Sequence, residues 1–570
     1  MNQDTSILAD PAVCASDTGR QLVVLCDGTN NTYNSGEGTN VLKLQELLGT
    51  DLQSSLVFYD PGVGSAAFAP ENTLSGWFKR FRERVEGLAF GSGVYDNITE
   101  AYTFLMREYQ PGDRIYVFGF SRGAFTARAV VGLVNAFGLL PQQSENLIPT
   151  LLNIYFKGTN DSVETAWEKL TTTVMRWEVA QGSRRVLSQK LKEHAVPLQR
   201  RSVTIHFVGV WDTVESIGMI PGLRESISAQ PTLTNKNGTR KCFTHVRQAL
   251  ALDEYRLRFA PRMYDENDTE ANEHGQSSQQ RWYPGAHCDV GGTYGDNALI
   301  SESAKHWLIS EALGKGLKLS APLPAAPSLS ETRPVLHSEL YDMPYWSIAG
   351  MAVRKTTYGH AAPDFSGIRY PQNTVWNKRR SLGAAVIAFG VCLLCSMLMA
   401  WAASGKLPTD IQQWWNVSSA FAEWSLHAWR GSEAMNPLLI HGHLKTAFFI
   451  DFFFIAAYGY LMGLMVTRSF ASLAGLNSFN SSGVDSRARW LNRLGHGMTF
   501  LVIADIMEGA LALTYLSTLG ELWAWLSGLL VILISLAACT KWLGLGMCVA
   551  LILWAAGAAI RPRANETVKP

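Results

Sequence analysis

The chain has 570 residues, its formal net charge is +1 at pH 7, and 47% of its residues are hydrophobic. This length exceeds one compact domain and predicts two or three. The near-zero net charge argues against nucleic acid as a partner, and the eight cysteines lack metal-site spacing in a polar setting. We therefore expect no nucleic acid, no metal and no other cofactor.

The N-terminal segment, residues 1–20, is polar and lacks the apolar core of a signal peptide. The apolar run QLVVLC at 21–26 then predicts a buried central strand. It ends in DGTNN at 27–31, residues that favour a turn. A backbone N–H in this turn, with Thr29 as the candidate, could help to bind an oxyanion. The alternative, a tight turn needed only for folding, stays open.

The segment 113–128, DRIYVFGFSRGAFTAR, contains a G-x-S-x-G pattern with Ser121 at its centre. Residues 115–118 predict a buried strand, and residues 124–132 are rich in helix formers. A strand, a tight turn with serine at its tip and a helix together form the nucleophile elbow of α/β-hydrolases. The alternative is a glycine-containing turn without chemistry, but the flanking elements favour a nucleophilic serine.

A nucleophilic serine needs a histidine to accept its proton and a carboxylate to orient that histidine. In α/β-hydrolases the acid follows the serine in the chain and the histidine comes last. Asp212 directly follows an apolar run at 203–210 that predicts a strand, and His287 lies in a turn-rich loop after an aromatic segment. We expect them to be the acid and the base, although a turn aspartate and a structural loop histidine are the alternatives.

Other acids and histidines have less suitable settings. Asp289 is a rival acid, but it is only two residues from His287, so we expect it to stabilise the loop. His206 lies inside the predicted strand and should be packed, and His245 and His274 lack a comparable position. Beside Thr29, the backbone N–H of Arg122 is the second candidate for the oxyanion hole.

Six motifs occur in a fixed order that resembles one known family. They are LCDGTNN at 25–31, TNV at 39–41, GDRIYVFGFSRGAFTAR at 112–128, VGVWDTV at 208–214, ALALDEYR at 249–256 and WYPGAHCDVGG at 282–292. Together they are similar to the α/β-hydrolase domain of type VI secretion phospholipase effectors and its relatives, over residues of about 20 to 310.

The resemblance implies an α/β-hydrolase core with Ser121, Asp212 and His287 as its triad. It also implies hydrolysis of glycerophospholipid acyl esters, in the manner of a phospholipase A. Used as an antibacterial effector, such a protein would need a partner immunity protein in the producing cell and a component of the secretion system. The strongly apolar C-terminal part departs from the better-known effectors of this family.

The composition changes sharply along the chain and predicts its domains. After the tail at 1–20 we expect a catalytic α/β-hydrolase domain with a mostly parallel sheet at 21–317. Within it, residues 146–200 read as a helical insertion that could form a lid over the serine. A proline-containing linker or cover segment at 318–380 then leads to an apolar domain at 381–570.

The apolar domain predicts an α-helical transmembrane bundle. A spanning helix needs about 20 apolar residues, and several runs reach or approach this length with few or no charges. These four or five candidate spans are 382–403, 446–467, 498–516, 522–540 and 542–560. Intramembrane acids are costly and suggest a function, so Asp451, Asp505 and Glu508 are notable within these runs.

Positive residues lie before the first span, at 378–380, and between the second and third, at 468–493. These segments should face the cytoplasm, so we expect a multi-pass protein of the inner membrane whose hydrolase domain is cytoplasmic. A chain delivered into another bacterium as a toxin would insert by a different route.

Two functions follow from these observations. The first is a membrane-associated serine hydrolase that cleaves phospholipid acyl esters, with phospholipid and the lipid bilayer as partners. The second is a membrane channel or scaffold in which the hydrolase-like domain is regulatory, which the acids Asp451, Asp505 and Glu508 would favour.

Overall fold

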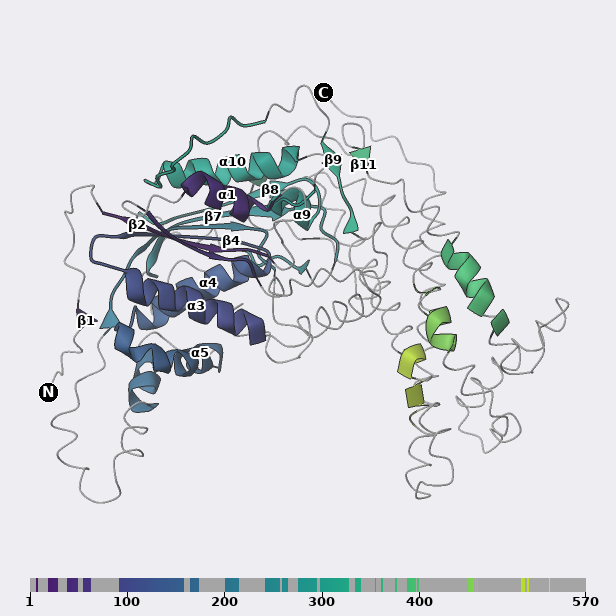
Figure 1. Cartoon of the computed structure of the whole chain (residues 1–570), viewed down its shortest axis with the longest axis horizontal. Helices are drawn as coiled ribbons and strands as arrows, with labels where there is room; N and C mark the ends of the chain where they lie inside the picture. Colours follow the sequence, from purple (N-terminus) through teal and green to yellow (C-terminus); the bar gives the residue numbers. More distant parts are fainter. Residues whose placement is uncertain are drawn as a thin grey trace, which may run out of the picture. The chain divides into compact units, whose positions relative to one another are not determined.

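The computed structural model describes a large part of the N-terminal half of the chain and short pieces of the C-terminal part (Figure 1). The described residues are 7–8, 19–28, 38–49, 55–62, 92–157, 165–173, 200–214, 241–256, 259–264, 275–294, 298–327, 334–339, 354, 360–361, 375–376, 387–395, 397–398, 450–455, 457, 459, 504–507, 510–511 and 533.

The chain divides into two compact units. The first contains Met1–Asp253, Phe259–Pro334 and Lys355–Gly367, and the second contains Glu254–Arg258, Val335–Arg354 and Ile368–Pro570. The large sheet and the residues Ser121, Asp212 and His287 belong to the first unit, and Asp451, Asp505 and Glu508 belong to the second.

A seven-stranded sheet forms the centre of the first unit, in the order β10-β8-β7-β6-β4-β2-β3. Every neighbouring pair in it is parallel, which confirms the predicted mostly parallel α/β class. Its strands are β2 (Gln21–Cys26), β3 (Ser55–Asp60), β4 (Arg114–Phe120), β6 (Ile205–Trp211), β7 (Phe243–Ala251), β8 (Ser277–Tyr283) and β10 (His360–Ala361).

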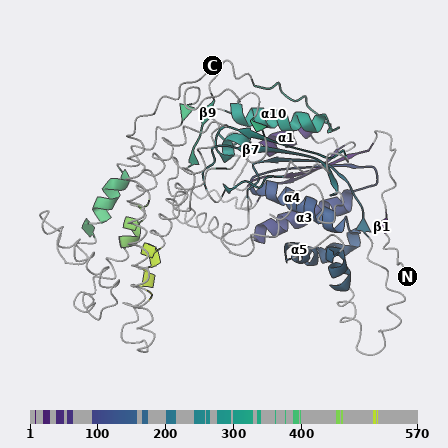
Figure 2. The ribbon, with the colours of Figure 1, turned by 180° about the vertical axis from the view of Figure 1, so that it is seen from behind.

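Helices cover both faces of this sheet, as the two opposite views show (Figures 1 and 2). One face carries α3 (Ser92–Glu108) and α4 (Arg122–Phe137), with α5 (Ile148–Lys157) beyond them, and the other carries α1 (Asn40–Leu48) and α10 (Leu299–Leu313). Parallel strands covered on both faces are buried along most of their length and are rich in apolar residues. This explains why all six residues of β2 are buried.

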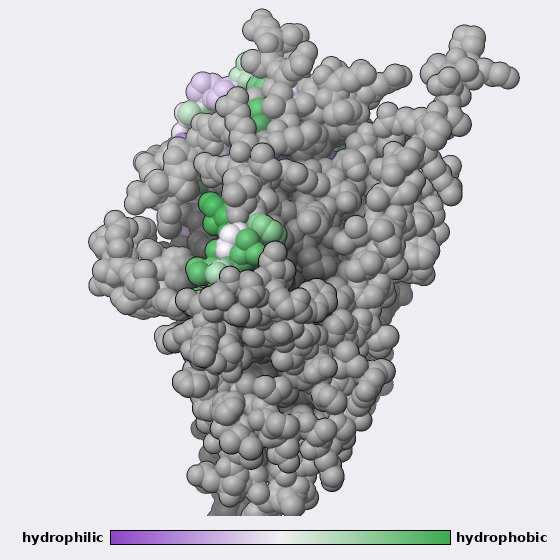
Figure 3. All heavy atoms as spheres, turned by 90° about the vertical axis from the view of Figure 1, so that its right-hand side faces the viewer, coloured by the Kyte–Doolittle hydropathy of each residue, from purple (hydrophilic) through white to green (hydrophobic). Residues whose placement is uncertain are grey.

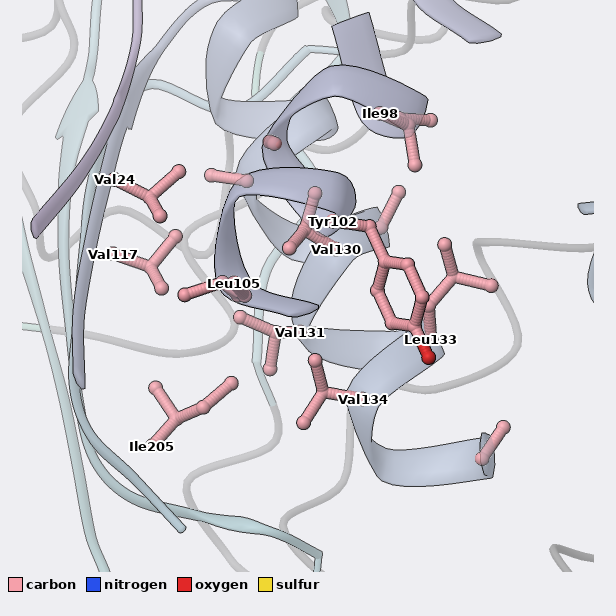
Figure 4. Close-up of a cluster of buried hydrophobic side chains, with 14 of the residues drawn as sticks. Val24, Ile98, Tyr102, Leu105, Val117, Val130, Val131, Leu133, Val134 and Ile205 are labelled. Atoms are coloured by element: carbon pink, nitrogen blue, oxygen red, sulfur yellow. The ribbon is translucent and has the colours of Figure 1, made fainter. Parts of the chain in front are cut away.

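The main core lies between the sheet and the helices α3 and α4 (Figure 4). Val24 of β2, Val117 of β4 and Ile205 of β6 extend from neighbouring strands toward these helices. Tyr102 of α3 is fully buried, and its hydroxyl donates a hydrogen bond to Gly138 O at 2.7 Å. A buried polar group needs such a partner, and this bond ties α3 to the end of α4.

Smaller elements complete the described part of the fold. A short strand, β1 (Ile7–Leu8), pairs in parallel with β5 (Arg200–Arg201), so the expected N-terminal tail includes a strand. In the second unit, β9 (Val335–Leu336) pairs with β11 (Val375–Trp376). The remaining elements are η1 (Gln142–Leu147) and α9 (His287–Gly291).

The predicted insertion at 146–200 is described only in part. It contains α5 and a helical piece at 165–173, in agreement with its expected helical character. The remainder of the insertion lies outside the described residues, so its role as a lid stays a prediction.

The predicted membrane spans lie mostly outside the described residues. Within them the structure describes helical pieces such as 387–395, whose side chains include the exposed Ile387, Phe389 and Leu394. Figure 3 shows hydrophobic side chains at the surface on the face that lies to the right in Figure 1. None of the helices that the structure describes is long and apolar enough to cross a membrane.

Candidate active site

Ser121 lies on a sharp turn between β4 and α4. Its φ angle is +58°, which few non-glycine residues adopt. A Cβ on Gly119 would lie 2.6 Å from Gly123 O, and one on Gly123 would collide with the carbonyl oxygens of Cys26 and Asp27. Only glycine fits two positions before and two positions after the serine. A strained backbone such as that of Ser121 is found most often at functional sites.

The strand register brings the end of β6 beside Ser121. Phe120 pairs with Trp211 across the β4–β6 ladder, and Ser121 N donates a hydrogen bond to Trp211 O at 3.1 Å. Asp212 follows Trp211 directly, so Ser121 and Asp212 are the first residues beyond two adjacent parallel strands. This places the predicted serine and acid at the same edge of the sheet.

Asp212 and His287 are in direct contact. The distance between His287 Nδ1 and Asp212 Oδ2 is 2.6 Å, and both side chains are buried. Asp212 Oδ1 accepts a second hydrogen bond, from Ala251 N at 2.9 Å. With both carboxylate oxygens bonded, the carboxylate is fixed in orientation and can hold the imidazole with its Nε2 atom on the opposite side of the ring.

Two aromatic rings fix the imidazole further. Phe120 stacks on His287 with 4.7 Å between ring centroids, and Phe259 meets it edge-on at 5.1 Å. Phe120 immediately precedes Ser121, so the stacking links His287 to the turn that carries Ser121. The structure therefore gathers all three predicted residues at the carboxyl edge of the sheet.

His287 is the first residue of the short helix α9, whereas the sequence predicted a loop. The pattern PGAH suggested a loop because proline and glycine favour turns. The turn is present, and Gly285 has a φ angle of +96°. The helix begins directly after it, because Asp289 Oδ2 accepts a hydrogen bond from Ala286 N at 2.8 Å and caps its first turn. Asp289 thus stabilises the segment, as expected.

Asp253 holds this same segment and was missed in the sequence. Its Oδ2 accepts a hydrogen bond from Gly285 N at 2.7 Å, and its backbone N donates to Gly285 O at 2.9 Å. The signal was present, because Asp253 comes just after β7 as Asp212 comes after β6. Carboxylates that follow neighbouring parallel strands meet at one edge of the sheet.

Asp27, the first residue of the DGTNN motif, and Thr39 and Asn40 of the TNV motif make further buried hydrogen bonds at this edge. Asp27 Oδ2 accepts hydrogen bonds from Thr39 Oγ1 at 2.5 Å and from Tyr59 OH at 3.0 Å. Asn40 Nδ2 donates to Val290 O at 2.8 Å, which ties the start of α1 to the helix that carries His287. These motifs therefore hold the segment of the base in place.

The two oxyanion-hole candidates differ in what the structure shows. Thr29 lies outside the described residues. Arg122 is the first residue of α4, directly after Ser121, and the N-terminus of a helix favours negative charge. Burial lowers the pKa of its guanidinium to about 10. In the described part of the chain, no group of three or more His, Cys, Asp or Glu side chains could hold a metal ion.

Solved structures give only distant likenesses. One is the crystal structure of an uncharacterized protein from Pseudomonas aeruginosa, with 15% identity, a TM-score of 0.31, and 89% of this chain and 68% of that chain covered. Another is the Tle1 effector bound to the VgrG spike of the type 6 secretion system, with 17% identity, a TM-score of 0.23, and 48% and 51% covered. At such TM-scores neither establishes a shared overall fold.

Sequence comparison is more decisive. A curated yeast relative, the uncharacterized protein YEL023C of Saccharomyces cerevisiae, is 31% identical over 246 residues, which are 43% of this chain. The chain spans about a third of that relative, 32% of its length. Residues 20–311, which include Ser121, Asp212 and His287, match the family described as type VI secretion system phospholipase effector Tle1-like, catalytic domain. The chain belongs to this family of Tle1-like phospholipase effector catalytic domains.

Proposed function

We propose that the chain is a serine phospholipase of the A type, with Ser121 as nucleophile, His287 as base and Asp212 as the orienting acid. The observation that carries this proposal is the 2.6 Å contact between His287 Nδ1 and Asp212 Oδ2 at the sheet edge where Ser121 occupies its strained turn. The family membership of residues 20–311 supports phospholipid as the substrate.

In this mechanism Ser121 Oγ attacks the acyl carbonyl carbon while His287 Nε2 accepts the hydroxyl proton. Asp212 keeps the Nδ1–H tautomer and stabilises the imidazolium. The backbone N–H of Arg122 and a second donor, for which Thr29 is the candidate, bind the tetrahedral oxyanion. The imidazolium then protonates the leaving glycerol oxygen, so that lysophospholipid departs and an acyl-enzyme remains. Water, deprotonated by His287, releases the fatty acid and restores Ser121.

The C-terminal apolar segments are suited to contact a lipid bilayer. Runs such as 382–403 carry no charge, and the described part of this run exposes Ile387 and Phe389. We therefore propose association with a lipid bilayer through this part of the chain. As an effector delivered by a type VI secretion system, the protein would act on the membranes of a target bacterium, and its producer would carry an immunity protein.

The test is fatty-acid release from phospholipid vesicles by the full chain purified in detergent. Ser121→Ala should lower the rate by a factor of about 10³ or more. Ser277→Ala is the matched control, because Ser277 also contacts a histidine but at the opposite edge of the sheet. A Ser121→Ala protein with unchanged release would overturn the proposal and would favour a channel or scaffold, which does not need the serine.

A further inference from the structure

The side chain of Arg122 has no counter-ion within the described part of the chain. It is half-buried at the first position of α4, directly beside the proposed nucleophile. Its pKa is lowered by burial, with no opposing contribution from a neighbouring carboxylate. A guanidinium withdrawn from water without a partner is costly, so an anionic ligand at this position would be favourable.

The other buried or half-buried arginines show what Arg122 lacks. Arg20 pairs with Asp113 at 3.0 Å, and Arg247 pairs with Glu311 at 2.7 Å. Arg128, on the same helix as Arg122, donates to Arg262 O at 2.5 Å and lies over the ring of Tyr264. Arg20, Arg247 and Arg128 thus each have a partner within the described part of the chain.

The carboxylates at the edge of the sheet near Arg122 are occupied by other donors. Asp27 accepts from Thr39 and Tyr59, and Asp212 accepts from His287 and Ala251. Asp253 and Asp289 bind backbone N–H groups of the segment before His287. These carboxylates therefore already bind other donors, and the positive charge of Arg122 stays available for a substrate.

Resting on the proposed function, we propose that the Arg122 guanidinium binds the phosphodiester of the glycerophospholipid whose acyl ester Ser121 attacks. In such a lipid only the glycerol backbone separates the phosphate from the ester, and consecutive residues of the turn would engage these two groups. The planar guanidinium can donate two parallel hydrogen bonds to phosphate oxygens. A neutral glyceride has no phosphate and would leave the guanidinium unpaired, so Arg122 makes the site selective for phospholipids.

The first test measures binding without turnover. Full-length Ser121→Ala protein in detergent is titrated with a non-cleavable dialkyl-ether phosphatidylglycerol and with the matching dialkylglycerol, which lacks phosphate. Adding Arg122→Gln should weaken binding of the phosphate-containing ether lipid about 10- to 100-fold and should change dialkylglycerol binding much less. Arg107→Gln is the matched control, because Arg107 is exposed and already paired with Glu145.

The second test compares kcat/KM for a phospholipid and for a diacylglycerol with the same acyl chains. In Arg122→Gln the ratio of the two values should fall about 10- to 100-fold. In Arg122→Lys the ratio should fall less far, because lysine keeps the positive charge but lacks the planar guanidinium that donates two parallel hydrogen bonds. This second variant also provides a test if the glutamine variant does not fold. Equal phosphate-lipid binding and an unchanged ratio in both variants would overturn the role of Arg122. Loss of the serine-dependent activity itself is a separate result, visible with Ser121→Ala alone.

Discussion

The two edges of the central sheet each carry a serine and a histidine, but in different settings. At the carboxyl edge, Ser121 occupies a strained turn and His287 is bonded to the buried Asp212. At the amino edge, His245 Nδ1 lies 2.8 Å from Ser277 Oγ, and both residues belong to regular paired strands. The hydrogen bond of the histidine is therefore made with a carboxylate at the carboxyl edge and with a serine at the amino edge.

The surrounding charges separate the two edges more clearly. Burial, Lys315, Arg247 and His206 lower the pKa of His245 to about 4, and Glu311 opposes this only in part. An imidazole held neutral by nearby cations is a poor proton acceptor, because the protonated form is disfavoured. His287 instead contacts the buried carboxylate of Asp212. The acid that contacts the histidine, Asp212, therefore distinguishes the two edges more clearly than the presence of a serine does.

The largest effect is expected from removing the charge of this acid. Asp212→Asn should lower kcat for fatty-acid release by about 10⁴-fold, because the amide favours the wrong tautomer of His287. Glu311→Gln, at the amino edge, should leave kcat within about twofold, since Glu311 pairs with Arg247. Comparable losses in both variants would remove the distinction between the edges.

The next largest effect is a loss of stability when a Cβ atom is added to a glycine at either edge. Gly123→Ala should destabilise the protein by about 3 kcal/mol or more, because the new Cβ would collide with backbone oxygens of β2 that cannot yield easily. Gly275→Ala is the matched variant, since it meets nothing within 4 Å and carries only the strain of a φ angle of +76°, about 1–2 kcal/mol. Urea unfolding of the two variants measures the difference, and equal midpoints would contradict it.

The smallest effect is a pH dependence at the amino edge. Because the pKa of His245 is lowered from 6.5 to about 4 in the folded protein, its neutral form stabilises the fold. That stability is complete above pH 6.5 and is lost as the pH falls toward 4. His245→Gln should therefore reduce the drop in thermal midpoint between pH 7 and pH 5. The drop should not vanish, because burial and Arg114 also lower the pKa of His206. An identical drop in both proteins would show that His245 does not contribute.

The local sequence pattern was sufficient to predict the parts of the site that depend on residues adjacent in the chain. The strand before Ser121, the flanking glycines and the helix after it all follow from a short stretch of sequence, and α4 extends a few residues beyond the prediction. Asp212 and His287 could be chosen because each follows a strand and the chain order was informative. Their contact spans 75 residues and depends on the strand order, which periodicity does not encode.

Long-range polar contacts were the part that the sequence could not supply. The bonds of Asp253 to Gly285 and of Asn40 to Val290 depend on which strands and helices become neighbours. The sequence also did not predict that Arg122 has no counter-ion among the described residues, because a sequence pattern shows an arginine but not whether a carboxylate lies near it. The helical start at His287 was missed because the turn before it dominated the local signal.

The placement of Ser121 and Asp212 directly after adjacent strands also bears on how such a protein can diversify. After Ser121 the chain runs through α4 and through the insertion that contains α5, and it returns along β6 to Asp212. The pairing of β4 with β6 sets the spacing of Ser121 and Asp212. The chain segment that connects these two residues can therefore become longer or shorter, or be replaced, without moving either residue. Access to the site can therefore change from one relative to another while its chemistry is inherited intact.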